Sequence, residues 1–416
     1  MSRSYEMKAV DCLTGRILLE SRLFVGLVGI LANLLFPDHD ADAFRSLPLA
    51  KSTQLDTVLQ TVFAGFFRWD GQHFWHIARH GYSFENSLAF YPLYPWLARC
   101  LAQCWYGLPL FHWFINYDTA LMLTFLGLSL VAFVCAGYVL FYLTHELIPQ
   151  ARTEHALITV CLFAVNPASI FFTAAYSESL FAFFTFLGLY LLYRREAKAV
   201  NAIEASICFG ISLVCRSNGL LNAGYVGFVL LTGIIRRFQS LSKKPTSQIA
   251  LKPTDKISRI RQRSQAATAT YSTPALVCLG LLSLTIMLLP LVCHNVYVYR
   301  QFCTKTGGHD APPTAEIQRL ARARNYTLPG TLQRLEWCAA FPPMFYGSIQ
   351  RKYWDVGWFA YYSLRKLPLF LLAAPTLIYG FLVVWKTLLT LGFAKHGFWI
   401  CVSEHLKLLF CKVVTN

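Results

Sequence analysis

Residues 68–80, RWDGQHFWHIARH, bring one Asp, three His and two Arg together in a chain that is otherwise poor in charge. Exposed loops seldom carry so many aromatic side chains, and buried cores seldom carry so many ionisable ones. Asp70 and the three His follow one another at spacings of three, three and four, so on a helix they would share one face. The three histidines are His73, His76 and His80. This stretch is therefore predicted to bind a ligand or to carry out chemistry.

Three hypotheses explain an acidic residue in this setting. Imidazole with a carboxylate suits zinc or manganese, but no second set of acidic ligands is evident, so we predict no metal site. Asp70 could instead act as a general base that takes a proton from a hydroxyl group. It could also simply cap a short helix, and this role is compatible with catalysis. Surrounding aromatic rings, including Trp69 and Tyr91, suit both the membrane interface and the faces of sugar rings.

The composition indicates which elements must hold this stretch. Hydrophobic residues make up 56% of the 416 residues and charged residues only 14%, which is typical of a polytopic membrane protein. The formal net charge of +16 is explained by Lys and Arg in cytoplasmic loops, and no nucleic-acid-binding pattern accompanies it. We therefore expect contact with a lipid bilayer and none with nucleic acid.

Long apolar segments recur along the chain, and their apolar residues do not alternate as barrel strands would. The fold class predicted is an all-α polytopic membrane protein with about eight crossings, forming one domain over residues 1–390. The segments lie at roughly 17–36, 119–143, 156–175, 177–193, 203–221, 223–235, 275–299 and 366–390.

The distribution of Lys and Arg predicts the orientation. Residues 236–263 hold nine basic residues and one acidic residue, which indicates a flexible cytoplasmic linker. Counting spans back from it places the N-terminus in the cytoplasm and residues 37–118 on the other side, as the first lumenal loop. Residues 300–355 form a second loop on that side. Cys303 and Cys338 lie in this loop and could pair, but sequence alone leaves the pairing open.

Polar residues enter two spans at the end that faces the first loop. Glu178 follows the segment NPAS, and Arg216 and Asn218 lie in CRSNGL. A snorkelling Arg and a Glu at a helix end would explain each of them singly. Ionisable groups at membrane depth usually face a cavity or a partner, so three segments converging on one face favour a site. Pro167 and Gly219 could interrupt the helices there.

These fragments together resemble a known family. RWDGQHFWHIARHGY with FYPLYP, then NPASIFFTAAYSESLF, CRSNGL and YWDVGWFAYYSLRKLPLFLLAAPT (353–376), are similar in sequence and order to the second mannosyltransferase of GPI-anchor assembly, the PIG-V type. The resemblance covers most of 17–385. It implies a GT-C-type glycosyltransferase with about eight transmembrane helices and interfacial helices in its large first lumenal loop. It also implies an endoplasmic reticulum membrane location with a lumenal active site.

The resemblance further implies a reaction and its substrates. Mannose would pass from dolichol-phosphate-mannose, α1,6-linked, to the first mannose of mannosyl-glucosaminyl-phosphatidylinositol, with no cofactor. A small membrane partner subunit is a further candidate contact. Enzymes of this superfamily place an essential acidic residue in the first lumenal loop, and Asp70 fits that position. Relative to the family, residues 391–416 look like a divergent or truncated tail.

Inversion at the sugar would need one base and no general acid, because phosphate is a good leaving group. Asp70 is the predicted base, and cations would neutralise the phosphate. The candidate phosphate partners are Arg68, Arg216 and Lys305. We expect His73 and His80 to orient Asp70 or bind the acceptor, Glu178 to bind sugar hydroxyls, and Asn218 to contact substrate.

Two other function classes stay open on sequence grounds. A transporter would share the many spans and broken helices, but no inverted repeat is apparent and the polar residues cluster at one face. Another transferase that uses a dolichol-linked sugar would share every feature except the acceptor. The orientation also predicts N-glycosylation at Asn325, in the motif Asn-Tyr-Thr of the second lumenal loop.

Overall fold

A computed structural model of the chain describes residues 2–36, 44, 49–50, 53–148, 152–194, 199–242, 272–304, 314–330, 335–357 and 364–390. Within these ranges every regular element is a helix and no strand occurs, which confirms the predicted all-α fold class. The predicted tail, 391–416, lies outside the described residues. Most of the predicted basic linker does too, although its first residues continue a helix as far as Ser242.

A helix lies at each predicted apolar segment of the described chain. Four of these helices, α1, α6, α12 and α16, are long and apolar enough to cross a membrane, while α7, α8 and α9 are shorter. The chain is therefore a multi-pass membrane protein, and the number of about eight crossings stays a prediction. The helices are α1 (Ser2–Leu35), α6 (Tyr117–Leu147), α7 (Thr153–Ala164), α8 (Glu178–Tyr193), α9 (Ala199–Cys215), α10 (Ala223–Ser242), α12 (Thr273–Cys303) and α16 (Leu367–Thr390).

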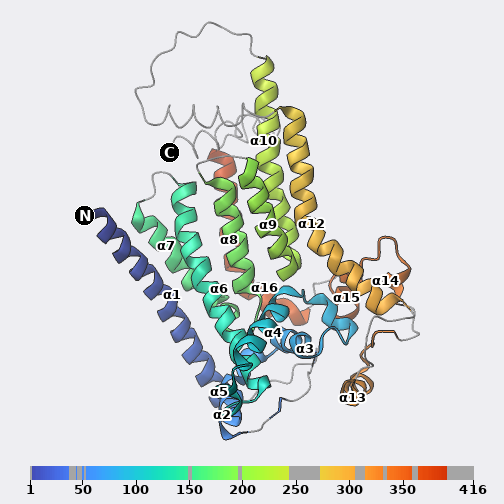
Figure 1. Ribbon diagram of the computed structural model, residues 1–416. Helices are drawn as coiled ribbons and strands as arrows, with labels where there is room; N and C mark the ends of the chain where they lie inside the picture. The colour runs from blue at the N-terminus through green and yellow to red at the C-terminus, as the bar shows by residue number, and fades with distance from the viewer. Residues whose placement is uncertain are drawn as a thin grey trace.

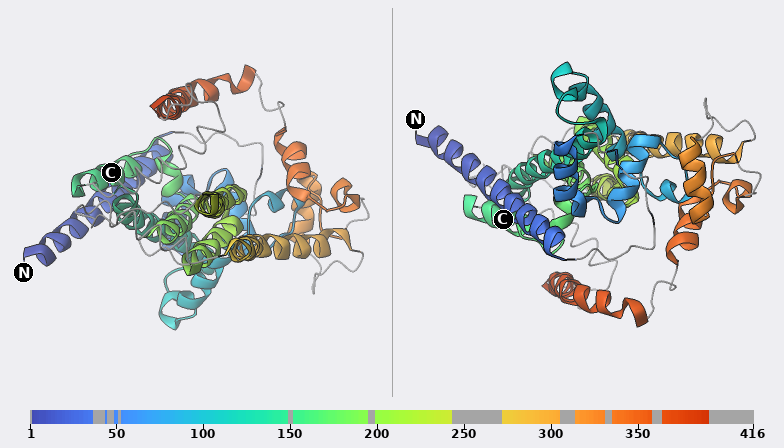
Figure 2. Two further views of the ribbon diagram at one scale, coloured as in Figure 1. Left: turned by 90° about the horizontal axis from the view of Figure 1, so that it is seen from above. Right: turned by 90° about the horizontal axis from the view of Figure 1, so that it is seen from below.

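Close helix packing forms the centre of this bundle. Helix α8 lies between α6 and α9, and α9 also packs against α12 (Figure 1). A Cβ atom at Gly210 would come within 3.1 Å of the carbonyl oxygen of Ile286, so a glycine lets α9 and α12 approach closely. Small residues serve the same purpose in membrane proteins generally, where packing rather than the hydrophobic effect holds helices together. Helix α16 stands at the periphery of the bundle (Figure 2).

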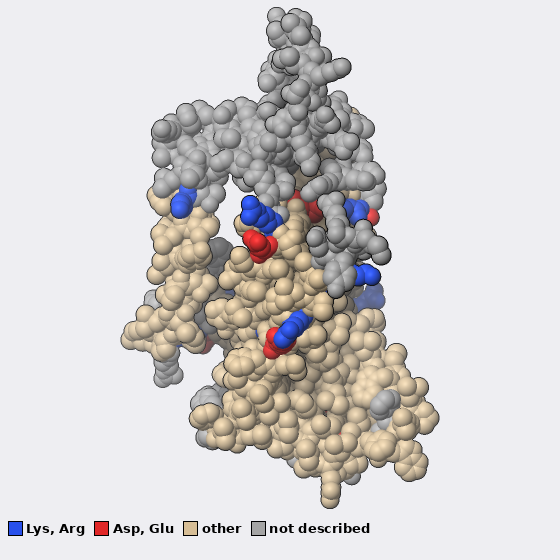
Figure 3. Space-filling view, turned by 90° about the vertical axis from the view of Figure 1, so that its left-hand side faces the viewer, with Lys and Arg blue, Asp and Glu red and all other residues tan. Residues whose placement is uncertain are grey.

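The outer faces of the helices suit a lipid environment. Large apolar side chains such as Leu23 and Phe24 on α1, and Leu372 on α16, are exposed. One side of the molecule carries few charged side chains over most of its surface (Figure 3). Apolar surface of this kind has no aqueous role but is required where helices contact hydrocarbon chains.

Two groups of short helices cover one end of the bundle, the lower end in Figure 1. The first group belongs to the predicted first lumenal loop and the second group to the second, so both loops lie at the same end. The first group is α2 (Gln54–Phe63), η1 (Ala64–Phe67), α3 (Asp70–His80), η2 (Glu85–Ala89), α4 (Leu93–Tyr106) and α5 (Pro109–His112). The second group is α13 (Ala315–Arg324), α14 (Glu336–Ala339) and α15 (Phe345–Trp354), followed by η5 (Leu364–Lys366) before α16.

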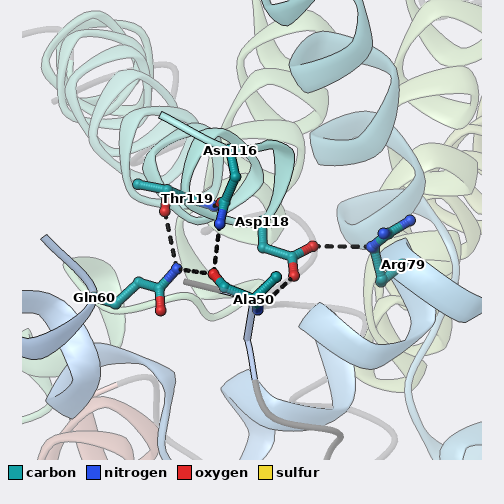
Figure 4. A network of polar contacts seen from close by, with 6 residues as sticks. All are labelled: Ala50, Gln60, Arg79, Asn116, Asp118 and Thr119. Atoms are coloured by element: carbon teal, nitrogen blue, oxygen red, sulfur yellow. Dashed lines mark hydrogen bonds and ion pairs between the residues drawn. The ribbon is translucent and has the colours of Figure 1, made fainter. Parts of the chain in front are cut away.

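A polar network fixes α3 to the start of α6 (Figure 4). The Nε of Arg79 donates to Asp118 at 2.9 Å, and the other carboxylate oxygen of Asp118 accepts from the backbone N–H of Ala50 at 3.0 Å. The Nε2 of Gln60 donates both to the Ala50 carbonyl and to the Thr119 hydroxyl. Helix α3 thus has a fixed position against a membrane-spanning helix.

The two groups of short helices are joined by a buried carboxylate and by a disulfide. Glu85 accepts from Lys352 Nζ at 2.5 Å, from the Tyr353 hydroxyl at 2.8 Å and from Trp337 Nε1 at 3.1 Å. We call these four residues the Glu85 clamp. Cys303 and Cys338 form a disulfide, the pairing that the sequence left open. Together these contacts hold α14 and α15 against η2 and the end of α12.

Candidate active site

Asp70 is the first residue of α3 and follows a strained turn. Trp69 has φ 55° and ψ −122°, and the N–H of Gly71 donates to the Arg68 carbonyl at 3.1 Å. These are the features of a type II′ turn with its first central position occupied by Trp, where glycine is usual. Strain of this kind persists only where the surroundings enforce it, and it clusters at functional sites. The turn sets Asp70 at the start of a helix with a defined orientation.

Two interrupted helices bring the other charged groups to the same place. Helix α7 ends at Ala164, before Pro167, and a short turn η3 (Ser169–Phe172) precedes Ser177 and α8. Helix α9 ends at Cys215, and Arg216 has extended backbone before η4 (Ser217–Asn222). The first break lies beside Pro167 as predicted, since proline removes a helical donor and clashes with the preceding turn. The second lies at Arg216, just before the predicted Gly219.

A glycine allows the second break to fold back closely. A Cβ atom at Gly219 would lie 2.5 Å from the backbone Cα and N of Leu213, a distance that no side chain can occupy. Only glycine therefore lets η4 pack on the end of α9. The fold-back leaves Arg216 at the corner, facing α8.

Arg216 and Glu178 form an ion pair beside Asp70. The Arg216 Nη1 lies 2.6 Å from Glu178 Oε1 and donates to the Ser177 hydroxyl at 3.2 Å. Burial raises the pKa of Asp70, and the positive charge of Arg216 lowers it in part. A carboxylate with a raised pKa in a cavity, next to a defined cation, is typical of a proton acceptor in catalysis.

A cavity of about 380 Å³ joins these groups. One wall comes from the first lumenal loop, another from the breaks before α8 and after α9, and a third from α15 and η5. The lining residues are Asp70, Phe74, Ala89, Phe90, Tyr91, Ser177, Cys215, Arg216, Ser217, Tyr346, Gln350, Trp354, Val356 and Lys366. The cavity thus combines one carboxylate, two cations and several aromatic rings.

Of the predicted site residues, Asp70 and Arg216 line this cavity. Glu178 holds Arg216 in place through the ion pair. The main-chain carbonyl of Arg68 accepts from the Tyr176 hydroxyl at 3.2 Å, and its side chain is not part of the cavity lining. Asn218 is exposed on η4 outside the lining.

The histidines do not join Asp70 in the cavity. His73 is 2% exposed and lies between the rings of Phe44 and Phe90, with centroids at 4.0 and 4.1 Å. Burial lowers the pKa of His73 well below its usual value, so the ring is neutral. His80 lines a second cavity of about 680 Å³ on another side of α3, together with Arg79 and Asp118. This larger cavity lacks Asp70, so we place the candidate site in the smaller one.

The remaining predicted residues lie elsewhere. Asn325 is exposed and ends α13 in the left-handed conformation, with φ 53°. Lys305 lies outside the described residues. Among the residues that the structure describes, no group of three or more His, Cys, Asp or Glu side chains is arranged to hold a metal ion.

Sequence reasoning missed the wall formed by the second lumenal loop. Gln350, Trp354 and Lys366 line the cavity from that side. The only available signal was the polar and aromatic motif at 353–366, which precedes an apolar span. Lys366 is a second cation in the cavity lining besides Arg216, and sequence reasoning did not single it out.

The arrangement suits transfer of a sugar from a phosphate. Asp70 can accept a proton, and Arg216 and Lys366 can neutralise a phosphate group. Aromatic rings such as Tyr91 and Trp354 offer apolar faces to a sugar.

Comparison with known proteins gives a consistent result. A family model described as Mannosyltransferase (PIG-V) matches residues 14–253 and 260–409. The protein named GPI alpha-1,6-mannosyltransferase 2 from Rattus norvegicus is 32% identical over 389 residues, 93% of this chain and 69% of that protein. GPI mannosyltransferase 2 from Drosophila pseudoobscura pseudoobscura is 32% identical over 381 residues, 88% and 74% of the respective chains.

A human relative extends the comparison. GPI alpha-1,6-mannosyltransferase 2 from Homo sapiens is 28% identical over 394 residues, 94% of this chain and 70% of that protein. No solved structure shows a significant match. The family model covers most of the chain, including every described segment that lines the cavity. The chain therefore belongs to the PIG-V family of mannosyltransferases.

Proposed function

We propose that this protein transfers mannose from dolichol-phosphate-mannose to the first mannose of the GPI precursor, forming an α1,6 linkage in GPI-anchor biosynthesis. Family membership and the names of its relatives support the reaction class. The observation that carries the proposal is the joint presence of Asp70, Arg216 and Lys366 around one cavity. The proposed location is the endoplasmic reticulum membrane, with the N-terminus cytoplasmic and the cavity lumenal.

In the proposed reaction the acceptor hydroxyl oxygen attacks the anomeric carbon of the donor mannose. The bond from that carbon to the phosphate oxygen breaks at the same time, which inverts the configuration. Asp70 takes the hydroxyl proton, and dolichol phosphate leaves with the bonding electrons. A raised pKa makes Asp70 a better proton acceptor as long as it remains ionised.

The cations act on the leaving phosphate. Arg216 is oriented by Glu178 and Ser177, so its position does not have to be organised during the reaction. Lys366 faces the cavity from η5, from the side of the second lumenal loop. The proposal places the phosphate between these two groups and the mannose beside Asp70. A small membrane partner subunit remains a separate prediction, which the proposed chemistry does not require.

The test measures mannose transfer from dolichol-phosphate-mannose to the one-mannose GPI precursor in microsomes, normalised to protein level. Asp70→Asn keeps the shape of the side chain but removes the proton acceptor, and it should lower the rate by roughly 10²- to 10⁴-fold. Glu336→Gln, an exposed carboxylate-to-amide change at the same end of the molecule, should leave the rate unchanged. The structure corrects the expectation that Asp70 caps α3, because Trp69 is the N-cap residue and no side chain makes a capping hydrogen bond there. Near-normal transfer by Asp70→Asn would therefore show that Asp70 is not the base.

A further inference from the structure

Arg22 lies in the middle of the apolar helix α1 and is 4% exposed. Its guanidinium group has five N–H donors, and acceptors are available for all five. Nη1 donates to the Ser169 carbonyl at 2.7 Å and to the Thr173 hydroxyl at 3.1 Å. Nη2 donates to the Ala164 carbonyl at 2.8 Å and to the Ser169 hydroxyl. Nε donates to the Ser21 hydroxyl at 3.3 Å.

The acceptors of Arg22 explain why a charge is tolerated at this depth. Helix α7 ends at Ala164, so its last carbonyl groups have no partner within the helix. The end of a helix carries partial negative charge, which favours a cation. The face of the guanidinium lies 4.1 Å from the ring centroid of Phe133. The positive charge of Arg22 is therefore compensated by carbonyl and hydroxyl oxygens at and after the end of α7. None of its hydrogen bonds goes to a carboxylate.

The segment held by Arg22 continues into the candidate active site. The N–H of Ala175 donates to the Phe66 carbonyl at 3.0 Å, directly before the Asp70 turn. The Tyr176 hydroxyl donates to the Arg68 carbonyl at 3.2 Å. Ser177 then accepts from Arg216. Residues 165–177 thus contact Arg22 at one end and both halves of the site at the other.

We propose that Arg22 is a positioning residue that sets the placement of residues 165–177, and through them the alignment of Asp70 with the Arg216–Glu178 pair. The part of this inference that concerns catalysis rests on the proposed mannosyl transfer. Arg22 does not line the cavity. It acts through the broken segment alone.

The number and geometry of donors make the inference specific to arginine. Lysine carries the same charge but has only three donors on one atom, so it cannot reach acceptors spread around a planar group. Thr173→Val removes a single acceptor and keeps the side-chain shape, which makes it a milder test. Arg16→Met is the matched control, because Arg16 lies on the same helix but is exposed and forms an ion pair with Glu20.

The experiment measures kcat and KM per folded molecule for purified variants in nanodiscs. Arg22→Met and Arg22→Lys should both lower kcat by on the order of 10- to 100-fold, because small misplacements of catalytic groups are costly. Thr173→Val should lower kcat by a smaller factor, and Arg16→Met should match the wild type. Normal kcat in folded Arg22→Lys would overturn the proposal, since charge alone would then suffice. A loss confined to the yield of folded protein would overturn it as well.

A second measurement does not depend on activity. The Cys215 thiol is 1% exposed and donates to the Ser177 carbonyl at 3.4 Å, so it reports on the end of the segment. Alkylation mapped by mass spectrometry should be faster at Cys215 in Arg22→Lys and Thr173→Val, with Cys104 as an exposed internal reference. Unchanged labelling in both variants would refute the positioning role. If the wild type shows no mannose transfer, the proposed function fails, while this labelling still decides the role of Arg22.

Discussion

The Glu85 clamp makes the second lumenal loop a wall of the cavity, and this can be tested by removing its acceptor. The Glu85 side chain is 2% exposed and accepts from three donors. Glu85→Ala removes the charged acceptor of Trp337, which is buried, and of Tyr353, which is half-buried. Helix α15, which contains Lys352 and Tyr353, should then open more often.

The magnitude follows from the burial of each partner. A hydrogen bond to a charged group contributes about 1.5–3 kcal/mol, and Trp337 and Tyr353 each lose one. The Lys352 side chain is 49% exposed, so water can replace Glu85 as its partner. The loss of the Lys352–Glu85 ion pair therefore adds little to the cost. We expect a cost of about 3–5 kcal/mol, in the range for breaking a buried charged contact. Because about 1.4 kcal/mol is tenfold, opening should rise by a factor between roughly 10² and a few thousand.

Amide hydrogen exchange of α15, measured in nanodiscs by mass spectrometry, reports this opening directly. Glu85→Ala should accelerate exchange in α15 while leaving α6 and α8 unchanged. Glu336→Ala is the control, because Glu336 precedes Trp337 but is exposed. Mannose transfer should fall with Glu85→Ala, since α15 carries three lining residues of the cavity. Equal exchange in α15 for the two variants would refute the clamp as described.

Two further predictions concern pH and glycosylation. Burial raises the pKa of Asp70, so Asp70 becomes protonated at a higher pH than an ordinary carboxyl group does. As the pH is lowered, kcat should therefore begin to fall at a higher pH than an ordinary carboxyl group would predict. Arg216→Met removes the cation that lowers this pKa and should move this fall in kcat to still higher pH; an unmoved fall in a variant with measurable activity would argue against Asp70 as the titrating group. Asn325 is exposed, so glycosidase should increase gel mobility of the wild type but not of Asn325→Gln. Cytoplasmic labelling of a Cys placed at 325 would contradict the proposed orientation.

The sequence predicted the parts of the site that local patterns encode. Asp70 and Arg216 are recognisable in the sequence because ionisable groups are rare within apolar segments. Pro167 predicts the break before α8. His73 was expected near Asp70 because the two lie one helical turn apart. The structure instead stacks His73 between Phe44 and Phe90, and Phe44 belongs to a segment that no local pattern connects with α3.

The cavity wall formed by α15 and η5 depends on contacts between distant parts of the chain. Lys352 and Glu85 are 267 residues apart, and no periodicity predicts such a pairing. Arg22 was overlooked because a single Arg in an apolar run resembles a snorkelling side chain. Its acceptors exist only after α7 has been broken and placed beside α1.

The walls of the cavity are far apart in the sequence, and this determines when the cavity can form during protein synthesis. The Asp70 turn is made early, whereas Lys366, at the opposite wall, is made almost three hundred residues later. Until then, Phe90 and Tyr91 lack the ring contacts that they make with Trp354 and Tyr346 in the folded protein, and long-range contacts of this kind form slowly. A nascent chain that extends just past Asp70 therefore carries the proposed base but not the cavity. The cavity can therefore form only after α15 and η5 have been synthesised and have docked against the first loop, so a chain cut short before residue 366 would contain Asp70 and Arg216 but lack one cavity wall.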